Sequence, residues 1–134
     1  MTRVYPVYVV DDDPNVRNLL CMLCEEKGLA CQTFADGEAF VSVLEGLEPG
    51  CVLLDMRLPR RNGLQVQAAL AERKDEFAVV AITGHGYVDM AVESMKLGAI
   101  DFLEKPFAND VFFDALDRAL AKLGERDRSS QQQV

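Results

Sequence analysis

Residues 51–63 of the chain read CVLLDMRLPRRNG: an unbroken apolar run ends at Asp55, and a loop that contains proline and glycine follows. Two more runs have the same form, since VYVV precedes Asp11 and VVAI precedes Thr83. Strands whose residues are nearly all apolar are typical of a parallel sheet that is covered on both faces. The three runs therefore predict the central strands of an α/β domain, each with a polar side chain at its carboxyl end.

Five apolar segments of this kind alternate with amphipathic stretches along the chain. Strands that alternate with helical patterns indicate βαβ units, so we expect a (βα)5 domain built on a parallel sheet. The expected strands are 4–10, 29–35, 51–54, 78–83 and 100–104, and the expected helices are 14–27, 37–47, 63–73, 88–97 and 108–123.

Residues at the element boundaries support this division. Asp13 precedes Pro14, which is the pattern of a helix N-cap followed by proline at the first helical position. Asn62 and Gln65 have the spacing of a capping box. Glycines at positions 28 and 98 stand where left-handed C-terminal caps are expected.

The length of 134 residues and the net charge of −8 exclude several classes of protein. The length suits one domain with a single core. The negative charge repels a nucleic-acid backbone, so we expect this domain not to bind DNA itself. No apolar run is long enough to span a bilayer, and the first residues lack the features of a secretory signal. These features predict a cytoplasmic protein without a membrane partner.

After Leu123 the composition changes to GERDRSSQQQV, which is almost entirely polar. Such a segment buries too little apolar surface to belong to the core. We therefore divide the chain into a domain at residues 1–123 and a polar linker or tail at residues 124–134. We expect the tail to lead to an output domain that this chain lacks; a freestanding domain is the alternative.

The four cysteines, at positions 21, 24, 31 and 51, are expected to stay reduced in a cytosolic protein and to act as small core residues. The Cys21-x-x-Cys24 pair lies inside a predicted helix, which argues against a redox or zinc site. His85 is the single histidine and has no cysteine at metal-ligand spacing, so we expect no transition-metal site there.

Polar residues collect at the carboxyl ends of the predicted strands, which is where an open parallel sheet places its site. Right-handed crossovers bring these ends to one edge of the sheet. Carboxylates held close together repel unless they bind protons or a cation, and Mg²⁺ combines a few carboxylates with phosphate oxygens. The residues that should converge are Asp11, Asp12, Asp13, Asp55, Thr83 and Lys105.

The residue types in this set suggest phosphoryl chemistry. Lys105 offers a positive charge to a phosphoryl oxygen, and Thr83 offers a hydroxyl donor. An aspartate that attacks phosphorus forms an acyl phosphate. Asp55 is the best placed because it stands alone at the end of a central strand, whereas Asp13 is better explained as a helix cap.

Four motifs in order, VVDDD, VLLDMRLPRRNG, VVAITGHG and GAIDFLEKPF, resemble those of the receiver domains of two-component response regulators, most closely the FixJ-like transcriptional regulators. The resemblance covers residues 4–123 and implies a flavodoxin-like three-layer sandwich with strand order 2-1-3-4-5. It implies that Asp55 is the phosphoacceptor, that Thr83 and Lys105 bind the phosphoryl group, and that the Lys105–Pro106 bond is cis. The Mg²⁺ ligands that it implies are Asp12 and Asp55 directly, Asp11 through water, and the backbone carbonyl of Arg57.

The resemblance also assigns residues around the site. The switch aromatic is Phe102, which lacks the hydroxyl of a tyrosine, so packing alone must drive its rotation. Arg57 and His85 flank the phosphoryl pocket and are expected to tune the access of water to it. Tyr87 departs from the pattern, in which an acid follows GHG directly.

The function that the resemblance implies is transfer of a phosphoryl group from a phosphohistidine on a sensor histidine kinase to Asp55, assisted by Mg²⁺. The domain is then a signalling module rather than an enzyme. Its change of conformation would control transcription through a DNA-binding output domain.

The predicted helix 88–97 carries more apolar residues than one buried stripe requires. One interpretation is that all of them belong to the core. The other is that part of this helix, with the strand that follows, forms a two-fold dimer interface once Asp55 is phosphorylated.

Two other classes fit the sequence less well. A phosphohydrolase of the haloacid-dehalogenase type also uses Mg²⁺ and would take Asp11-x-Asp13 as its acid pair, but it leaves Asp55 without a role. A flavin-binding flavodoxin needs a loop after the first strand that cradles a phosphate, and here that loop carries three acids.

Overall fold

The computed structural model of the protein, which describes residues 3–84 and 86–132, contains one sheet of five parallel strands in the predicted order 2-1-3-4-5. Every residue of the three central strands is buried, as their apolar runs predict. The strands are β1 (Val7–Val10), β2 (Cys31–Phe34), β3 (Gly50–Asp55), β4 (Phe77–Thr83) and β5 (Asp101–Glu104). The first strand begins later than expected, because Pro6 has no N–H to offer to the ladder.

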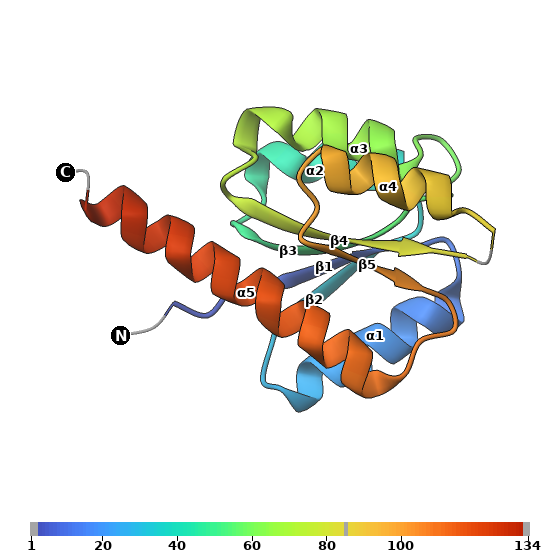
Figure 1. The fold of residues 1–134 in the computed structure, drawn as a ribbon, viewed down its shortest axis with the longest axis horizontal. Helices are drawn as coiled ribbons and strands as arrows, with labels where there is room; N and C mark the ends of the chain where they lie inside the picture. Colours follow the sequence, from blue (N-terminus) through green and yellow to red (C-terminus); the bar gives the residue numbers. More distant parts are fainter. Residues whose placement is uncertain (1–2, 85, 133–134) are drawn as a thin grey trace.

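Helices cover both faces of the sheet and complete the flavodoxin-like sandwich, as Figure 1 shows. Two apolar cores result, one under α1 and α5 and the other under α2, α3 and α4. The helices are α1 (Pro14–Glu26), α2 (Gly37–Val43), α3 (Gly63–Leu70), α4 (Val88–Lys96) and α5 (Asn109–Gln132), and short 3-10 turns at Leu44–Gly46 and Ala71–Arg73 extend α2 and α3.

The predicted caps of α1, α3 and α4 are confirmed by hydrogen bonds and backbone angles. The Asp13 carboxylate accepts from the backbone N–H of Asn15 and caps α1. Asn62 and Gln65 form the reciprocal capping box of α3, each with a bond of 2.9 Å. The glycines at positions 28 and 98 have φ angles of 74° and 107° and end α1 and α4 in the left-handed conformation.

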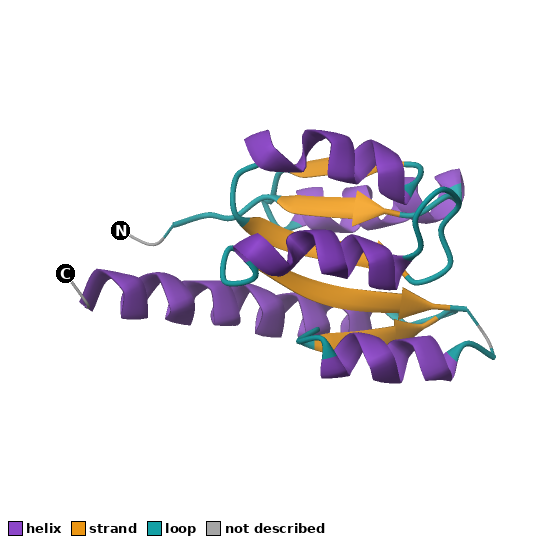
Figure 2. Cartoon of the chain, turned by 90° about the horizontal axis from the view of Figure 1, so that it is seen from above, coloured by secondary structure: helices purple, strands orange, loops and turns teal. Residues whose placement is uncertain are grey.

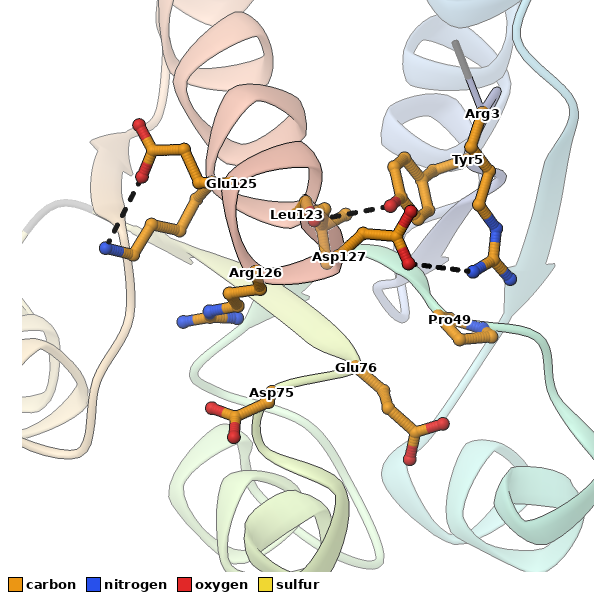
Figure 3. A pocket seen from close by; sticks show the side chains of 10 residues that line it. Arg3, Tyr5, Pro49, Asp75, Glu76, Leu123, Glu125, Arg126 and Asp127 are labelled. Atoms are coloured by element: carbon orange, nitrogen blue, oxygen red, sulfur yellow. Dashed lines mark hydrogen bonds and ion pairs between the residues drawn. The ribbon is translucent and has the colours of Figure 1, made fainter. Parts of the chain in front are cut away.

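The prediction that the last helix ends at Leu123 is wrong, because α5 continues to Gln132. Two other segments, the N-terminal segment and the segment that leads into β4, lie against this end of α5 (Figure 3). The Tyr5 hydroxyl donates to the carbonyl of Leu123 at 3.3 Å, and Arg3 lies 3.9 Å from Asp127. Arg126 donates to the backbone carbonyls of Lys74 and Phe77 at 3.2 and 3.1 Å. These contacts, rather than apolar periodicity, stabilise the extra turns.

We expect Arg126→Gln to loosen the end of α5. A guanidinium that bonds carbonyl groups contributes on the order of 1 kcal/mol when it is partly exposed, so amide hydrogen exchange over residues 124–132 should become about fivefold faster. Arg128→Gln removes the same charge from an exposed position on the same helix and is the matched control. Equal exchange rates in the two variants would contradict the anchoring role of Arg126.

The prediction that all four cysteines stay reduced is also wrong, because Cys21 and Cys31 form a disulfide. Cys21 lies on α1 and Cys31 begins β2, and the packing of α1 on β2 brings their Cα atoms within 5.5 Å, a separation typical of disulfides. Cys24 and Cys51 are free and buried, as predicted. Burial raises the pKa of the Cys24 thiol to about 11, so this thiol is unreactive.

The carboxyl ends of all five strands point to the same edge of the sheet, on the right in Figure 2, and both chain ends lie at the opposite edge. Loops that follow the strands therefore meet at one end of the domain. Within the part of the chain that the structure describes, no helix combines the length and the apolar character needed to cross a membrane.

Candidate functional site

The strand register brings the predicted acidic residues together. Val10 pairs with Leu54, so Asp11 and Asp55, the residues that follow them, lie side by side at the carboxyl edge. Asp12 comes next on the β1 side. One carboxylate oxygen from each of the three aspartates lies within 4.8 Å of the others. Asp11 and Asp55 are buried, whereas Asp12 is exposed.

The register of the next two strand pairs adds Thr83 and Lys105. Asp55 pairs with Ile82 and Thr83 pairs with Glu104, so each polar residue is one step further along the edge. The Lys105 ammonium lies 2.9 Å from Asp11 Oδ2 and 3.2 Å from Asp55 Oδ2. The Lys105–Pro106 bond is cis, as predicted. The sheet thus assembles carboxylates, a hydroxyl and an ammonium from four strands.

The pKa values of two groups in the site, Asp55 and Lys105, are both raised, for different reasons. Burial raises the pKa of Asp55, and the neighbouring Asp11 carboxylate raises it further, while the backbone N–H of Arg57 and the Lys105 ammonium oppose this rise. Burial alone would lower the pKa of Lys105, but its contacts with Asp11 and Asp55 outweigh that effect and raise it. Lys105 therefore stays charged, while Asp55 is the acid that holds a proton more readily than usual.

The loop after β3 folds back tightly on the site. The backbone N–H of Arg57 donates to Asp55 Oδ1 at 2.9 Å, and the N–H of Gly63 donates to the Met56 carbonyl at 3.0 Å. A Cβ atom at position 63 would lie 2.8 Å from the Asp55 carbonyl oxygen, so this close approach requires glycine. The loop orients one oxygen of Asp55 and leaves the site open above it.

A cleft of about 640 Å³ opens over these residues, lined by Asp12, Asp55, Arg57, Tyr87 and Lys105 among others. Its walls carry acids, cations and a phenol, which suit a small charged group that enters from solvent. A second hollow, of about 540 Å³, lies at the opposite edge of the domain between α5 and the N-terminal segment (Figure 3). The acids that line this second hollow come from α5 and from the segment before β4, and not from the carboxyl ends of the strands.

The remaining predicted residues lie around the cleft. The Thr83 hydroxyl is buried and donates to the carbonyls of Tyr87 and Gly84 at 3.0 and 3.2 Å. Phe102 is not among the residues that line the cleft; it lies on the outer strand β5, and the residue is 38% exposed. His85 lies outside the described residues. Asp13 acts as the helix cap, and its backbone N–H donates to Asp11 Oδ1 at 2.9 Å.

Two contributors were not predicted from the sequence. Arg17, one turn into α1, donates to the backbone carbonyl of Asp11 at 2.8 Å and steadies the acidic loop. Tyr87 hydrogen-bonds the Arg57 guanidinium, whose central carbon lies 4.4 Å from the centre of the phenol ring. The one signal in the sequence was that an aromatic residue stands where the motif has an acid.

The donor set fits a hard divalent cation. All three acidic side chains offer oxygen, and Lys105 neutralises only one of their negative charges, so an excess of two remains. Such a set suits Mg²⁺, which prefers oxygen ligands and keeps several waters. The exposed carboxylate of Asp12 leaves room for those waters.

Comparison with known proteins agrees with this geometry. Residues 7–117 match the family model of the response regulator receiver domain. The transcriptional regulatory protein FixJ of Bradyrhizobium diazoefficiens is 40% identical over 120 residues, which cover 90% of this chain and 58% of that protein. The chain thus spans less than two-thirds of that curated relative.

Solved structures give the same result. The crystal structure of FixJ-N superposes with a TM-score of 0.81 at 37% identity and covers 89% of this chain and 95% of that one. Full-length FixJ from B. japonicum superposes with a TM-score of 0.85 at 37% identity, covering 96% of this chain and 63% of that one. The protein belongs to the response regulator receiver domains, and within that family it is of the FixJ-like type.

Proposed function

We propose that Asp55 accepts a phosphoryl group from a phosphohistidine of a sensor histidine kinase. The observation that supports this most is the convergence of Asp11, Asp12, Asp55 and Lys105 under one open cleft. These residues supply a nucleophilic carboxylate, the ligands for a cation and a positive charge, and the Thr83 hydroxyl at the neighbouring strand end adds a donor for a phosphoryl oxygen. The haloacid-dehalogenase alternative has no support from the family match, and we do not retain it.

In the transfer, an oxygen of Asp55 attacks phosphorus while the phosphorus–nitrogen bond to the kinase imidazole breaks. The electron pair leaves with that nitrogen. Lys105 neutralises charge on the phosphoryl oxygens, and the backbone N–H of Arg57 holds Asp55 Oδ1 so that the other oxygen faces the cleft. Asp11, Asp12, Asp55 and the carbonyl of Arg57 would hold Mg²⁺, which neutralises phosphoryl charge when it is bound.

Labelling tests this assignment directly. Acetyl phosphate and Mg²⁺ should add one phosphoryl group to the chain, and peptide mapping should find it on the peptide that contains Asp55. A label on the peptide with Asp11 would instead indicate a hydrolase-like nucleophile. Absence of any label under these conditions would remove the proposal.

We expect Thr83→Ala to accept the phosphoryl group but to respond less to it. The hydroxyl bonds the carbonyl of Tyr87 in this structure, and a phosphoryl group would offer it a stronger, charged acceptor. Mass spectrometry should show the adduct, while the change in hydrogen exchange of α4 on phosphorylation should fall to less than half that of the wild type. Thr83→Ser keeps the hydroxyl and should retain the response; a full response in Thr83→Ala would contradict this role.

Transcription control is the output that we propose for the longer protein. The FixJ relatives are transcriptional regulatory proteins, and the chain covers only part of them. Residues 1–123 would be the receiver, and residues 124–134 would lead to a DNA-binding domain. Because α5 runs through this boundary, the connection begins as a helix. The domain itself, with its negative charge, should not bind DNA, and a cytoplasmic location stays a prediction.

The outer face of α4 supports the proposed phosphorylation-dependent dimer. Ala91 is buried, but Val88, Val92 and Met95 are between 39% and 46% exposed, so the core does not use all the apolar residues of this helix. Phe102 on the adjacent β5 extends the exposed surface. A self-complementary apolar patch of this kind suits a two-fold contact.

Sedimentation tests the dimer. The untreated chain should be monomeric at about 50 μM, and acetyl phosphate with Mg²⁺ should convert most of it to dimer. Val92→Glu should keep the phosphoryl adduct and remain monomeric, because an unpaired charge at an apolar contact is costly. Val43→Glu, at a similarly exposed position on α2, is the control and should dimerise. A phosphorylated wild type that stays monomeric would remove the dimer proposal.

A further inference from the structure

Tyr87 is held by two groups that belong to the phosphoryl cleft. Its phenol bonds the Arg57 guanidinium, which also stacks on its ring at 4.4 Å from the ring centre. Its backbone carbonyl accepts from the Thr83 hydroxyl at 3.0 Å. Tyr87 itself lines the cleft beside Asp55 and Lys105. The residue therefore connects the loops after β3 and β4 across the mouth of the site.

Tyr87 also occupies the position directly before α4. It is the N-cap residue of that helix, and its side chain makes no capping hydrogen bond. The first turn of α4 thus lacks the stabilisation that a serine, threonine or aspartate cap would give. The contacts of Tyr87 with Arg57 and Thr83 hold the residue from which this turn starts.

The other half of α4 is fixed to the body of the domain. The buried Ser94 hydroxyl donates to the Gln67 side chain on α3 at 2.6 Å, and the Gln67 amide donates to the Ser94 carbonyl at 3.2 Å. Ala91 is fully buried under the same helix. The helix is therefore fixed to α3 through Ser94 in its second half and packs on the core through Ala91, whereas Tyr87, the residue before its first turn, is held by loop contacts.

We propose that the Arg57–Tyr87 contact is a latch that phosphorylation of Asp55 opens, so that Tyr87 leaves the mouth of the cleft and the first turn of α4 moves. This inference rests on the proposed function of Asp55. It assigns to Tyr87 a positioning role: it conveys the state of the cleft to α4 and does not take part in phosphoryl transfer.

The physical reason is competition for the same two donors. A phosphoryl group brings nearly two negative charges and three strong acceptor oxygens. Charge-assisted bonds from a guanidinium to phosphate are about twice as strong as bonds to a neutral phenol. The hydroxyl of Thr83 likewise gains a charged acceptor in place of a carbonyl. Both contacts of Tyr87 are therefore weakened by one event.

Fluorine resonance of 3-fluorotyrosine tests this movement, because the chain has only three tyrosines. Tyr5 and Tyr8 are buried and donate to the carbonyls of Leu123 and Glu48. Adding beryllofluoride and Mg²⁺, which mimic the phosphoryl group on an aspartate, should shift the Tyr87 signal and leave the other two in place. Tyr87→Phe identifies the Tyr87 signal.

Tyr87→Phe also tests the latch energetically. Loss of the phenol hydroxyl removes its bond to Arg57, which the proposal places only in the unphosphorylated state, and keeps the stacked ring. The population therefore shifts towards the phosphorylated conformation. The beryllofluoride concentration for half-saturation should fall about fivefold, the effect of one ordinary hydrogen bond. Tyr5→Phe, at the far edge of the sheet, is the matched control and should leave it unchanged.

The outcomes separate the latch from the proposed function. A Tyr87 signal that stays in place while beryllofluoride is bound overturns the latch, as does an unchanged half-saturation concentration in Tyr87→Phe. In both cases Asp55 remains the phosphoacceptor. A wild type that binds no beryllofluoride and accepts no phosphoryl group overturns the proposed function, and the role of Tyr87 falls with it.

Discussion

Asp55→Asn should abolish the phosphoryl adduct that acetyl phosphate and Mg²⁺ produce, with intact mass as the measurement. The amide has no carboxylate oxygen to attack phosphorus, and it withdraws one of the three acidic ligands from the cation site. We expect at least a hundredfold loss of labelling rate, because Asp55 is the carboxylate that the Arg57 N–H orients at the floor of the open cleft.

The same variant should fold at least as stably as the wild type at neutral pH without Mg²⁺. Burial raises the pKa of Asp55, so its favourable contribution to stability is present at low pH and lost as the pH rises through that pKa. Asparagine keeps the neutral form at every pH, and its melting temperature should therefore exceed that of the wild type near pH 7. Lower stability would show that the amide is not tolerated and that lost labelling has another cause.

Asp75→Asn is the matched control for this experiment. Asp75 is an exposed acid in the loop before β4, at the edge opposite the cleft. It undergoes the same chemical change without touching the site, and its labelling should equal that of the wild type. Stoichiometric labelling of Asp55→Asn would show that another residue is the phosphoacceptor.

The fold and the acidic site were predictable because they depend on patterns within short segments. Apolar runs such as CVLL mark buried parallel strands, and the parallel arrangement then requires that the residues after them, Asp11 and Asp55, meet at one edge. The strand register turned this expectation into distances of a few ångströms. No other long-range information was needed for that part of the site.

The features that the sequence did not predict have a different cause, because each depends on contacts between two separate segments that no local sequence pattern links. The Cys21–Cys31 disulfide follows from the packing of α1 on β2. The extension of α5 follows from carbonyl groups near β4 that accept from Arg126. The contact of Arg57 with Tyr87 joins two loops. Helix periodicity and motif spacing carry no signal for the disulfide or the longer helix, and for the contact of Arg57 they show only that Tyr87 departs from the motif.

Mg²⁺ should raise the stability of the chain by an amount that depends on Asp12 and not on Asp13. A ligand that binds only the folded state stabilises by mass action, and for a dissociation constant of about 1 mM, 10 mM Mg²⁺ contributes about 1.4 kcal/mol. This corresponds to a rise of roughly 4 °C in melting temperature. Calorimetry with and without Mg²⁺ measures it, and the difference should vanish in Asp12→Ala.

Asp12 is the informative position because it is exposed, so its removal disturbs the fold little. Asp11 is buried and paired with Lys105 at 2.9 Å, and its loss would confuse ligand and structural effects. Asp13→Ala is the matched control: it removes the cap of α1 and lowers stability by about 1 kcal/mol, equally with and without Mg²⁺.

The Mg²⁺ effect should also weaken as the pH falls. Protons and Mg²⁺ compete for the Asp55 carboxylate, and the raised pKa of this group brings that competition to a higher pH than an ordinary aspartate would show. Loss of Mg²⁺ stabilisation in Asp13→Ala with retention in Asp12→Ala would contradict the ligand set. A stabilisation that is independent of pH down to the range of ordinary aspartates would show that Asp55 is not among the ligands, because its proton would then have no bearing on the cation.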